Sequence, residues 1–218
     1  RGIRCVLDQT VAERSSIYKL LLEEEKMWPG WSKSPFTVNE DDWELVDRQN
    51  QEQDLADAII CGSSFVKDSL LARGVAAEKI HVIPFGRCKD NMNAHSISQL
   101  DRDRADELRI LFAGSVGLRK GIPYLLEALR QLKGKIPFTC KVVGNVEISH
   151  EKMLKYENVC QFTGLLPRSQ MKTVYHWANL FVFPSICEGS AMVTYEAMNW
   201  KLPIVATYNA GSIVRDGV

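Results

Sequence analysis

From residue 109 onward, short apolar runs alternate with segments of helical pattern. The runs are nearly continuous in apolar residues, as expected of parallel strands that are buried on both faces. We expect strands at 109–115, 138–144, 159–164, 180–185 and 203–208. Between them the pattern predicts helices at 122–133, 149–156, 167–178 and 191–200. This alternation favours an α/β fold with a Rossmann-like, doubly wound parallel sheet.

In such sheets, ligands bind beyond the carboxyl ends of the strands. Glycines and polar residues follow several of the predicted strands at this edge: Gly114-Ser115, Gly144, Gly164 and Glu188-Gly189. We therefore expect the binding site at the carboxyl edge of this sheet, on the strand pattern alone.

The first part of the chain has a less complete pattern. Strands are predicted at 3–8, 58–61 and 79–84, with helices at 11–27 and 39–56. Ser63 is a plausible helix N-cap and Gly74 a plausible helix end. We interpret 1–90 as the C-terminal part of an acceptor-side Rossmann-like domain and 91–107 as a polar linker. Residues 108–218 would form the nucleotide-sugar (donor) domain. The chain opens at Arg1 without a methionine, so we expect an internal piece of a longer protein, cut at both ends.

Composition restricts the classes of partner. The 27 basic and 27 acidic residues give zero net charge, which does not favour a nucleic-acid surface. No apolar run approaches the ~20 residues that a membrane-spanning helix needs. The 6 cysteines form no C-x-x-C pair, which indicates free thiols in a reducing, cytoplasmic compartment. The 4 histidines lack metal-ligand spacing, so we predict no metal site.

Two glutamates, Glu188 and Glu196, follow the apolar run at 180–185. An ionised carboxylate accepts hydrogen bonds through two oxygens and can hold a neighbouring pair of hydroxyls. Two spaced carboxylates suit two polyol rings, such as a ribose and a hexose. The spacing alone is weak, because most glutamates lie on solvated helix faces.

A basic pair, Arg119-Lys120, is predicted to open a helix after the turn at Gly114-Ser115. Helix N-termini favour anions, and arginine can engage a phosphate through two donors. The alternative is a solvated basic pair. Cations at this end oppose the helix dipole, so a phosphate role explains them better.

The motifs together resemble retaining two-domain (GT-B) glycosyltransferases of family 4, also called group 1. The resemblance rests on FPSICEGSAMVTYEAM at 183–198, ILFAGS at 110–115 with RKG at 119–121, and FTGLLP at 162–167. A weaker match is ADAII at 56–60. These motifs keep the family order over most of the chain.

The resemblance implies transfer of a sugar from a nucleotide-diphospho-sugar to an acceptor hydroxyl, with retention of configuration. Arg119 and Lys120 would grip the diphosphate and stabilise its developing charge, with Ser115 as an added donor. Glu188 would face the transferred sugar and Glu196 would bind the ribose. Backbone groups complete the implied site: Gly114, Gly144, Gly164, Gly189, Ser190, Ala191 and Met192.

The same resemblance implies no obligatory cofactor or metal, because the nucleotide-sugar is a substrate. The acceptor would be a carbohydrate, a lipid-linked molecule or a small molecule. Residues preceding Arg1 would carry the acceptor-side glycine loop and any peripheral membrane contact. We therefore expect the 218-residue chain by itself to be inactive in transfer.

The chain also departs from the family pattern. Ser190 stands where a bulky residue is usual, and Ala191 and Lys201 stand where glycine is frequent. The final glutamate of the pattern is absent after Gly211. Two alternatives stay open: a nucleotide-sugar epimerase or hydrolase on the same fold, and a non-catalytic binding module. The tryptophans at 28, 31 and 43 indicate packing or a partner surface, rather than a sugar platform.

Overall fold

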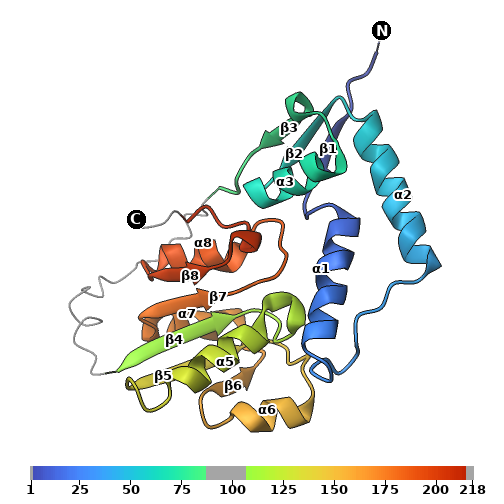
Figure 1. Cartoon of the computed structure of the whole chain (residues 1–218). Helices are drawn as coiled ribbons and strands as arrows, with labels where there is room; N and C mark the ends of the chain where they lie inside the picture. The colour runs from blue at the N-terminus through green and yellow to red at the C-terminus, as the bar shows by residue number, and fades with distance from the viewer. Residues whose placement is uncertain (1, 87–106, 215–218) are drawn as a thin grey trace.

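The computed structural model describes residues 2–86 and 107–214, which form two parallel β-sheets (Figure 1). The predicted linker at 91–107 lies almost wholly outside the described residues. The first sheet has the strand order β1-β2-β3, and the second has the order β6-β5-β4-β7-β8. The α/β class and the parallel pairing predicted from the apolar runs are confirmed.

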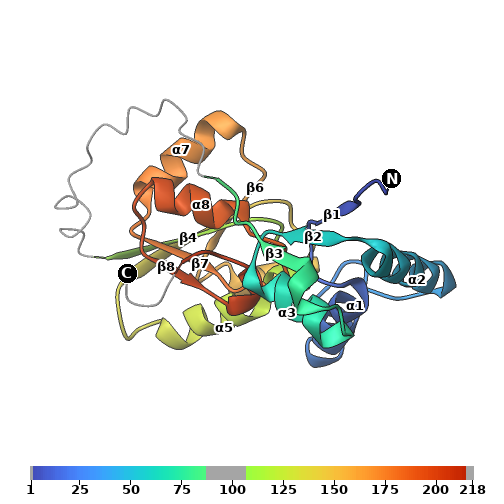
Figure 2. The same ribbon diagram turned by 90° about the horizontal axis from the view of Figure 1, so that it is seen from above.

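The second sheet contains the strands predicted after residue 107, each slightly shorter than expected. They are β4 (Leu108–Ala113), β5 (Phe138–Val143), β6 (Gln161–Gly164), β7 (Leu180–Phe183) and β8 (Ile204–Ala206). The helices between them are α5 (Ile122–Leu132), α6 (His150–Tyr156), α7 (Arg168–Trp177) and α8 (Met192–Asn199). Figure 2 shows α5 on one face of this sheet and α7 and α8 on the other.

The strand order reverses between β4 and β7, because the chain winds outward from β4 to β6 and then returns on the other side. The loops after β4 and β7 therefore leave the sheet at the point of this reversal, at the carboxyl ends of the strands, where ligands bind in such folds. Of the predicted site residues, Ser115, Arg119 and Lys120 follow β4, whereas Glu188 and Gly189 follow β7.

The first sheet consists of β1 (Val6–Gln9), β2 (Ala58–Cys61) and β3 (Ile80–Val82). Its helices are α1 (Arg14–Met27), α2 (Glu40–Leu55) and α3 (Ser64–Arg73). Asn39 forms a capping box with Asp42 at the start of α2, and Ser63 caps α3 through the N–H of Val66. Gly74 ends α3 in the left-handed conformation, as its position predicts.

Two buried clusters support these sheets. The smaller lies between the first sheet and α3, around Ile59, Val66 and Leu70. The larger surrounds the second sheet and includes stacked rings, with the centroids of Phe112 and Phe183 5.8 Å apart. The apolar runs are therefore core strands, as their composition predicts.

Trp31 belongs to the larger cluster, although it precedes β2 in the chain. Its side chain is 5% exposed, and its ring lies 5.6 Å from that of Tyr156 and 5.4 Å from that of Trp28. Two main-chain contacts fix the same loop: a bridge between Ser32 and Ile148, and the bond from the Ser149 N–H to the Trp31 carbonyl. Residues early in the chain therefore pack as part of the second sheet's core.

No described helix is long and apolar enough to cross a membrane. The cysteines within the described residues are free thiols, and all of them except Cys5 are buried.

Candidate active site

The glycines predicted at the strand ends come together in the second sheet. The Gly114 N–H donates to the Val143 carbonyl at 2.9 Å, and the Gly144 N–H donates to the Gly164 carbonyl at 3.0 Å. These bonds extend the sheet beyond its strands. They also occupy two of the backbone donors that the sequence suggested for a ligand, so a ligand here would have to use other groups.

Arg119 and Lys120 lie in a 3-10 turn at Leu118–Lys120, before α5 begins. This corrects the prediction that the pair opens the helix. The reason is Gly121, which separates the turn from α5 in a left-handed conformation (φ 66°). A Cβ at Gly121 would lie 1.8 Å from the Pro184 carbonyl oxygen, so only glycine allows the two loops to meet.

The basic pair and Glu188 form an ion-pair cluster in which Lys120 and Glu188 are largely buried and Arg119 is exposed. Glu188 Oε1 accepts from Lys120 Nζ, from an Arg119 guanidinium N–H at 3.2 Å, and from Ser185 Oγ at 2.8 Å. The side chains of Lys120 and Glu188 are only 12% and 13% exposed, whereas that of Arg119 is 44% exposed. Burial lowers the pKa of Lys120, and Glu188 partly offsets this effect. The structure therefore joins three predicted site residues.

The loop that carries Glu188 is held by its neighbours. The Ile186 N–H donates to the Arg119 carbonyl at 2.9 Å, and the Glu188 N–H donates to the Asn209 carbonyl at 2.9 Å. Asn209 Nδ2 in turn donates to the Ile186 carbonyl at 2.8 Å. The sequence did not predict that Ser185 and Asn209 hold Glu188 and its loop in place. The Pro-Ser of the motif was a signal for Ser185, whereas no local pattern marks Asn209.

Glu196 lies on an exposed position of α8, apart from the ion-pair cluster. Tyr175 on α7 donates a 2.8 Å hydrogen bond from its hydroxyl to Glu196 Oε2. Burial raises the pKa of Tyr175, so its hydroxyl stays protonated and remains a donor. This bond fixes the carboxylate while leaving it accessible to solvent, as a receptor for hydroxyls requires.

The loop at 189–192 was expected to offer its backbone N–H groups to the donor sugar or phosphate, and the structure differs from this in part. The Ala191 N–H donates to the Ala210 carbonyl at 3.1 Å, and Ser190 Oγ lies 3.0 Å from the buried Tyr195 hydroxyl. Ala191 has φ −69°, so its replacement of a glycine introduces no strain. Met192 begins α8 with an exposed side chain. Lys201, the other glycine replacement, adopts φ 54°, a left-handed conformation that glycine favours.

Gly189 contacts the segments that follow β1 and β2 of the first sheet. A Cβ on it would lie 1.7 Å from the Thr10 carbonyl oxygen, and its own carbonyl accepts from Ser63 Oγ at 2.5 Å. Glycine is therefore required here by close approach, a role that the sequence did not reveal. The loop beside Glu188 thus packs against the segments that follow β1 and β2.

Residues 107–218 match the family of glycosyl transferases group 1, over more than half of the chain. The chain belongs to the group 1 glycosyltransferase family.

Two curated relatives illustrate the range of this family. The sulfoquinovosyl transferase SQD2 of Arabidopsis thaliana is 23% identical over 176 residues, which cover 78% of this chain and 33% of that protein. A lipopolysaccharide 1,2-N-acetylglucosaminetransferase of Salmonella typhimurium is 28% identical over 179 residues, covering 73% of this chain and 47% of that protein. This glycosyltransferase chain therefore spans less than half the length of either relative.

Solved structures show the same fold. Anabaena HepE in complex with UDP matches 95% of this chain and 60% of its own with a TM-score of 0.59 and 18% identity. Sucrose-phosphate synthase of Thermosynechococcus elongatus matches 94% of this chain and 50% of its own with a TM-score of 0.62 and 19% identity. The GT-B fold implied by the motifs is confirmed.

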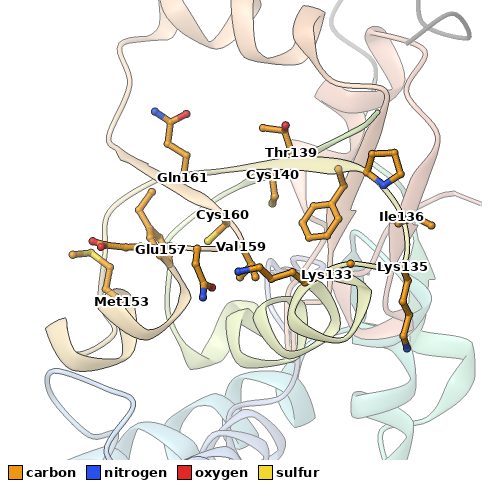
Figure 3. Close-up of a pocket in the computed structure, with 15 residues that line it drawn as sticks. Lys133, Lys135, Ile136, Thr139, Cys140, Met153, Glu157, Val159, Cys160 and Gln161 are labelled. Atoms are coloured by element: carbon orange, nitrogen blue, oxygen red, sulfur yellow. The ribbon is translucent and has the colours of Figure 1, made fainter. Parts of the chain in front are cut away.

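Cavity size does not by itself locate the site of this glycosyltransferase. A cavity of about 870 Å³ lies at the amino ends of β5 and β6, where Figure 3 shows Cys140, Cys160 and Lys133 around it. It contains no predicted site residue. A smaller cavity of about 390 Å³ includes Arg119. Within the described residues, no group of acidic, histidine or cysteine side chains could hold a metal ion.

Proposed function

We propose that this group 1 glycosyltransferase moves a sugar from a nucleotide-diphospho-sugar to an acceptor hydroxyl, with retention of configuration. Retention is included because the motif at 183–198 resembles that of the retaining family 4 enzymes. The nucleotide base of the donor stays unassigned. The acceptor is a carbohydrate, a lipid-linked molecule or a small molecule. In this protein, residues 1–90 would belong to the acceptor-side domain, 91–107 to the linker and 108–218 to the donor domain. The buried free thiols suit a cytoplasmic location.

The observation that carries this proposal is the ion-pair cluster at the reversal of strand order. Lys120 is held largely away from water, and Arg119 lies beside it at the carboxyl edge of the sheet. In glycosyl transfer, negative charge grows on the leaving diphosphate. Fixed cations in a site with little water stabilise such charge strongly, without reorganisation during the reaction.

Glu188 pairs with both of these cations. Its Oε1 is the acceptor shared by Lys120, Arg119 and Ser185. A bound diphosphate would compete for the same donors and release the carboxylate to accept hydroxyls of the donor sugar. In this proposal Glu188 therefore has two partners in turn, the basic pair and then the sugar.

Titration calorimetry of the protein with UDP, GDP and ADP tests the proposed function. We expect at least one of these nucleoside diphosphates to bind. The absence of binding heat with all three at millimolar concentration would refute the donor site. For retention, the test is the anomeric configuration of the first identified product, determined by NMR.

Replacing Glu196 with alanine is expected to weaken binding of the best nucleoside diphosphate about ten- to hundredfold. The ribose hydroxyls lose a charged acceptor, worth about 1.5–3 kcal/mol, at ~1.4 kcal/mol per tenfold change. Tyr175→Phe should weaken binding less, because the carboxylate stays and only its orientation is relaxed. Calorimetry on both variants measures this. Glu151→Ala is the control, because its side chain is 87% exposed and lies on α6. Unchanged affinity in Glu196→Ala would remove Glu196 from the site.

Replacing Glu188 with glutamine is expected to tighten nucleoside diphosphate binding by about tenfold, or ~1.4 kcal/mol. The amide keeps the size of the side chain but no longer neutralises Lys120, so a diphosphate meets an uncompensated cation. Binding should also become more dependent on salt, since more net charge is neutralised on binding. Calorimetry at two salt concentrations measures both effects. Weaker binding in this variant would contradict the proposed exchange of partners.

A further inference from the structure

The cavity of about 390 Å³ beside the ion-pair cluster shares Arg119 with the donor site described above, and its other lining residues have no role assigned there. It lies between the loop at 32–36 and the two loops that lead from β4 and β5 toward α5 and α6. Arg119 lines it and also donates to Glu188, so the cavity adjoins the basic pair. Its volume falls within the range of about 300–1,000 Å³ that is usual for small-molecule sites.

The walls of this cavity are fixed by main-chain contacts. Lys33 joins the two sides, since its N–H donates to the Glu147 carbonyl at 2.9 Å and its Nζ to the Val146 carbonyl at 2.7 Å. The Glu147 N–H donates to the Val116 carbonyl at 3.0 Å, which ties the loops after β4 and β5 together. A site held in this way needs little ordering when a ligand binds.

The lining combines hydrogen-bonding groups with one aromatic ring. Ser34 and Asn145 offer donors and acceptors, and Phe36 supplies the ring. The Glu147 carboxylate lies close over the loop after β4, since a Cβ at Gly117 would be 2.6 Å from its Oε2.

The charges of the lining balance, because the cavity contains the carboxylates of Glu25 and Glu147 and the cations of Lys33 and Arg119. A neutral ligand therefore fits better than an ion. A sugar ring meets these demands, because each hydroxyl both donates and accepts and its C–H face packs on an aromatic side chain.

We propose that this cavity binds a neutral sugar ring of the acceptor. The proposal rests on the proposed function and names the acceptor class for it, with Phe36 and Glu147 as positioning and specificity-determining residues. In the transfer, the acceptor hydroxyl oxygen bonds to the anomeric carbon and the bond from that carbon to the diphosphate breaks. The diphosphate leaves with the electron pair and takes the hydroxyl proton.

The test is saturation-transfer NMR of the protein with the methyl glycosides of glucose, galactose, mannose and N-acetylglucosamine. We expect transfer to the ring protons of at least one glycoside. The signal should fall at least about fivefold, or ~1 kcal/mol if affinity sets it, in Phe36→Ala and in Glu147→Gln. Phe36→Tyr keeps the ring and should retain the signal. Glu151→Gln, on the neighbouring helix outside the cavity, should also leave it unchanged.

Glu147 is exposed, so its variant is expected to fold even if Phe36→Ala does not. The proposal is overturned if no glycoside in the panel receives saturation, or if Glu147→Gln leaves the signal at its original strength. Titration of the same samples with UDP, GDP and ADP separates the two ideas. Nucleotide binding without glycoside binding would refute only the proposal that the cavity binds the acceptor. Glycoside binding without nucleotide binding would refute only the proposed donor site.

Discussion

Replacing Lys120 with alanine is expected to raise the dissociation constant of the best nucleoside diphosphate by about a hundredfold or more. Two causes act together. The diphosphate loses a buried cation, and the Glu188 carboxylate stays in place as a less compensated negative charge beside it. Truncating one partner of a buried, hydrogen-bonded charge pair costs about 2–5 kcal/mol.

Calorimetry measures the affinity, and a double-mutant cycle assigns its cause. If the unpaired carboxylate contributes, the double variant Lys120→Ala/Glu188→Gln should bind more tightly than Lys120→Ala alone. Lys133→Ala, an exposed lysine outside the site, is the matched control and should bind normally. An affinity within about twofold of the original protein, or ~0.4 kcal/mol, in Lys120→Ala would exclude Lys120 from a diphosphate site.

Replacing Trp31 with alanine should lower the free energy of unfolding by about 3–5 kcal/mol, the usual cost of deleting a large buried aromatic side chain. The ring is 5% exposed and contacts both Tyr156 and Trp28, so its removal leaves a cavity in the core of the second sheet. Urea denaturation followed by circular dichroism measures the change.

Trp43 is the matched control for this substitution. It is 49% exposed, and its ring makes an edge contact with that of Tyr18. Trp43→Ala should cost less than about 1 kcal/mol, as is usual for surface positions. Equal costs for the two variants would show that the segment around Trp31 is not part of the larger core.

The strands and helices after residue 107 were predictable because local composition determines them. A run such as Leu180–Phe183 is apolar at every position, which is typical of a parallel strand covered on both faces. The caps at Asn39 and Ser63 were predictable for the same local reason, since each side chain bonds a backbone group three residues away.

The relations between distant residues were not predictable from local pattern. The sequence assigned Lys120 to the diphosphate and Glu188 to the sugar, but the pairing of these two side chains depends on how two loops pack. Trp31 falls within the segment 1–90 that the sequence analysis assigns to the acceptor-side domain, whereas its ring packs in the core of the second sheet. The turn at Leu118–Lys120 was read as helix because the constraint on Gly121 comes from Pro184, far away in the chain.

The close approaches at Gly121 and Gly189 have a consequence for the comparison of this chain with its relatives. At both positions a methyl group would collide with a backbone oxygen of a distant segment, whatever chemistry the protein performs. A descendant that had lost transfer would still need both glycines in order to fold. Their presence in a relative therefore indicates shared architecture, whereas under the proposed function a lysine at 120 together with a glutamate at 196 would be the better sign of shared activity.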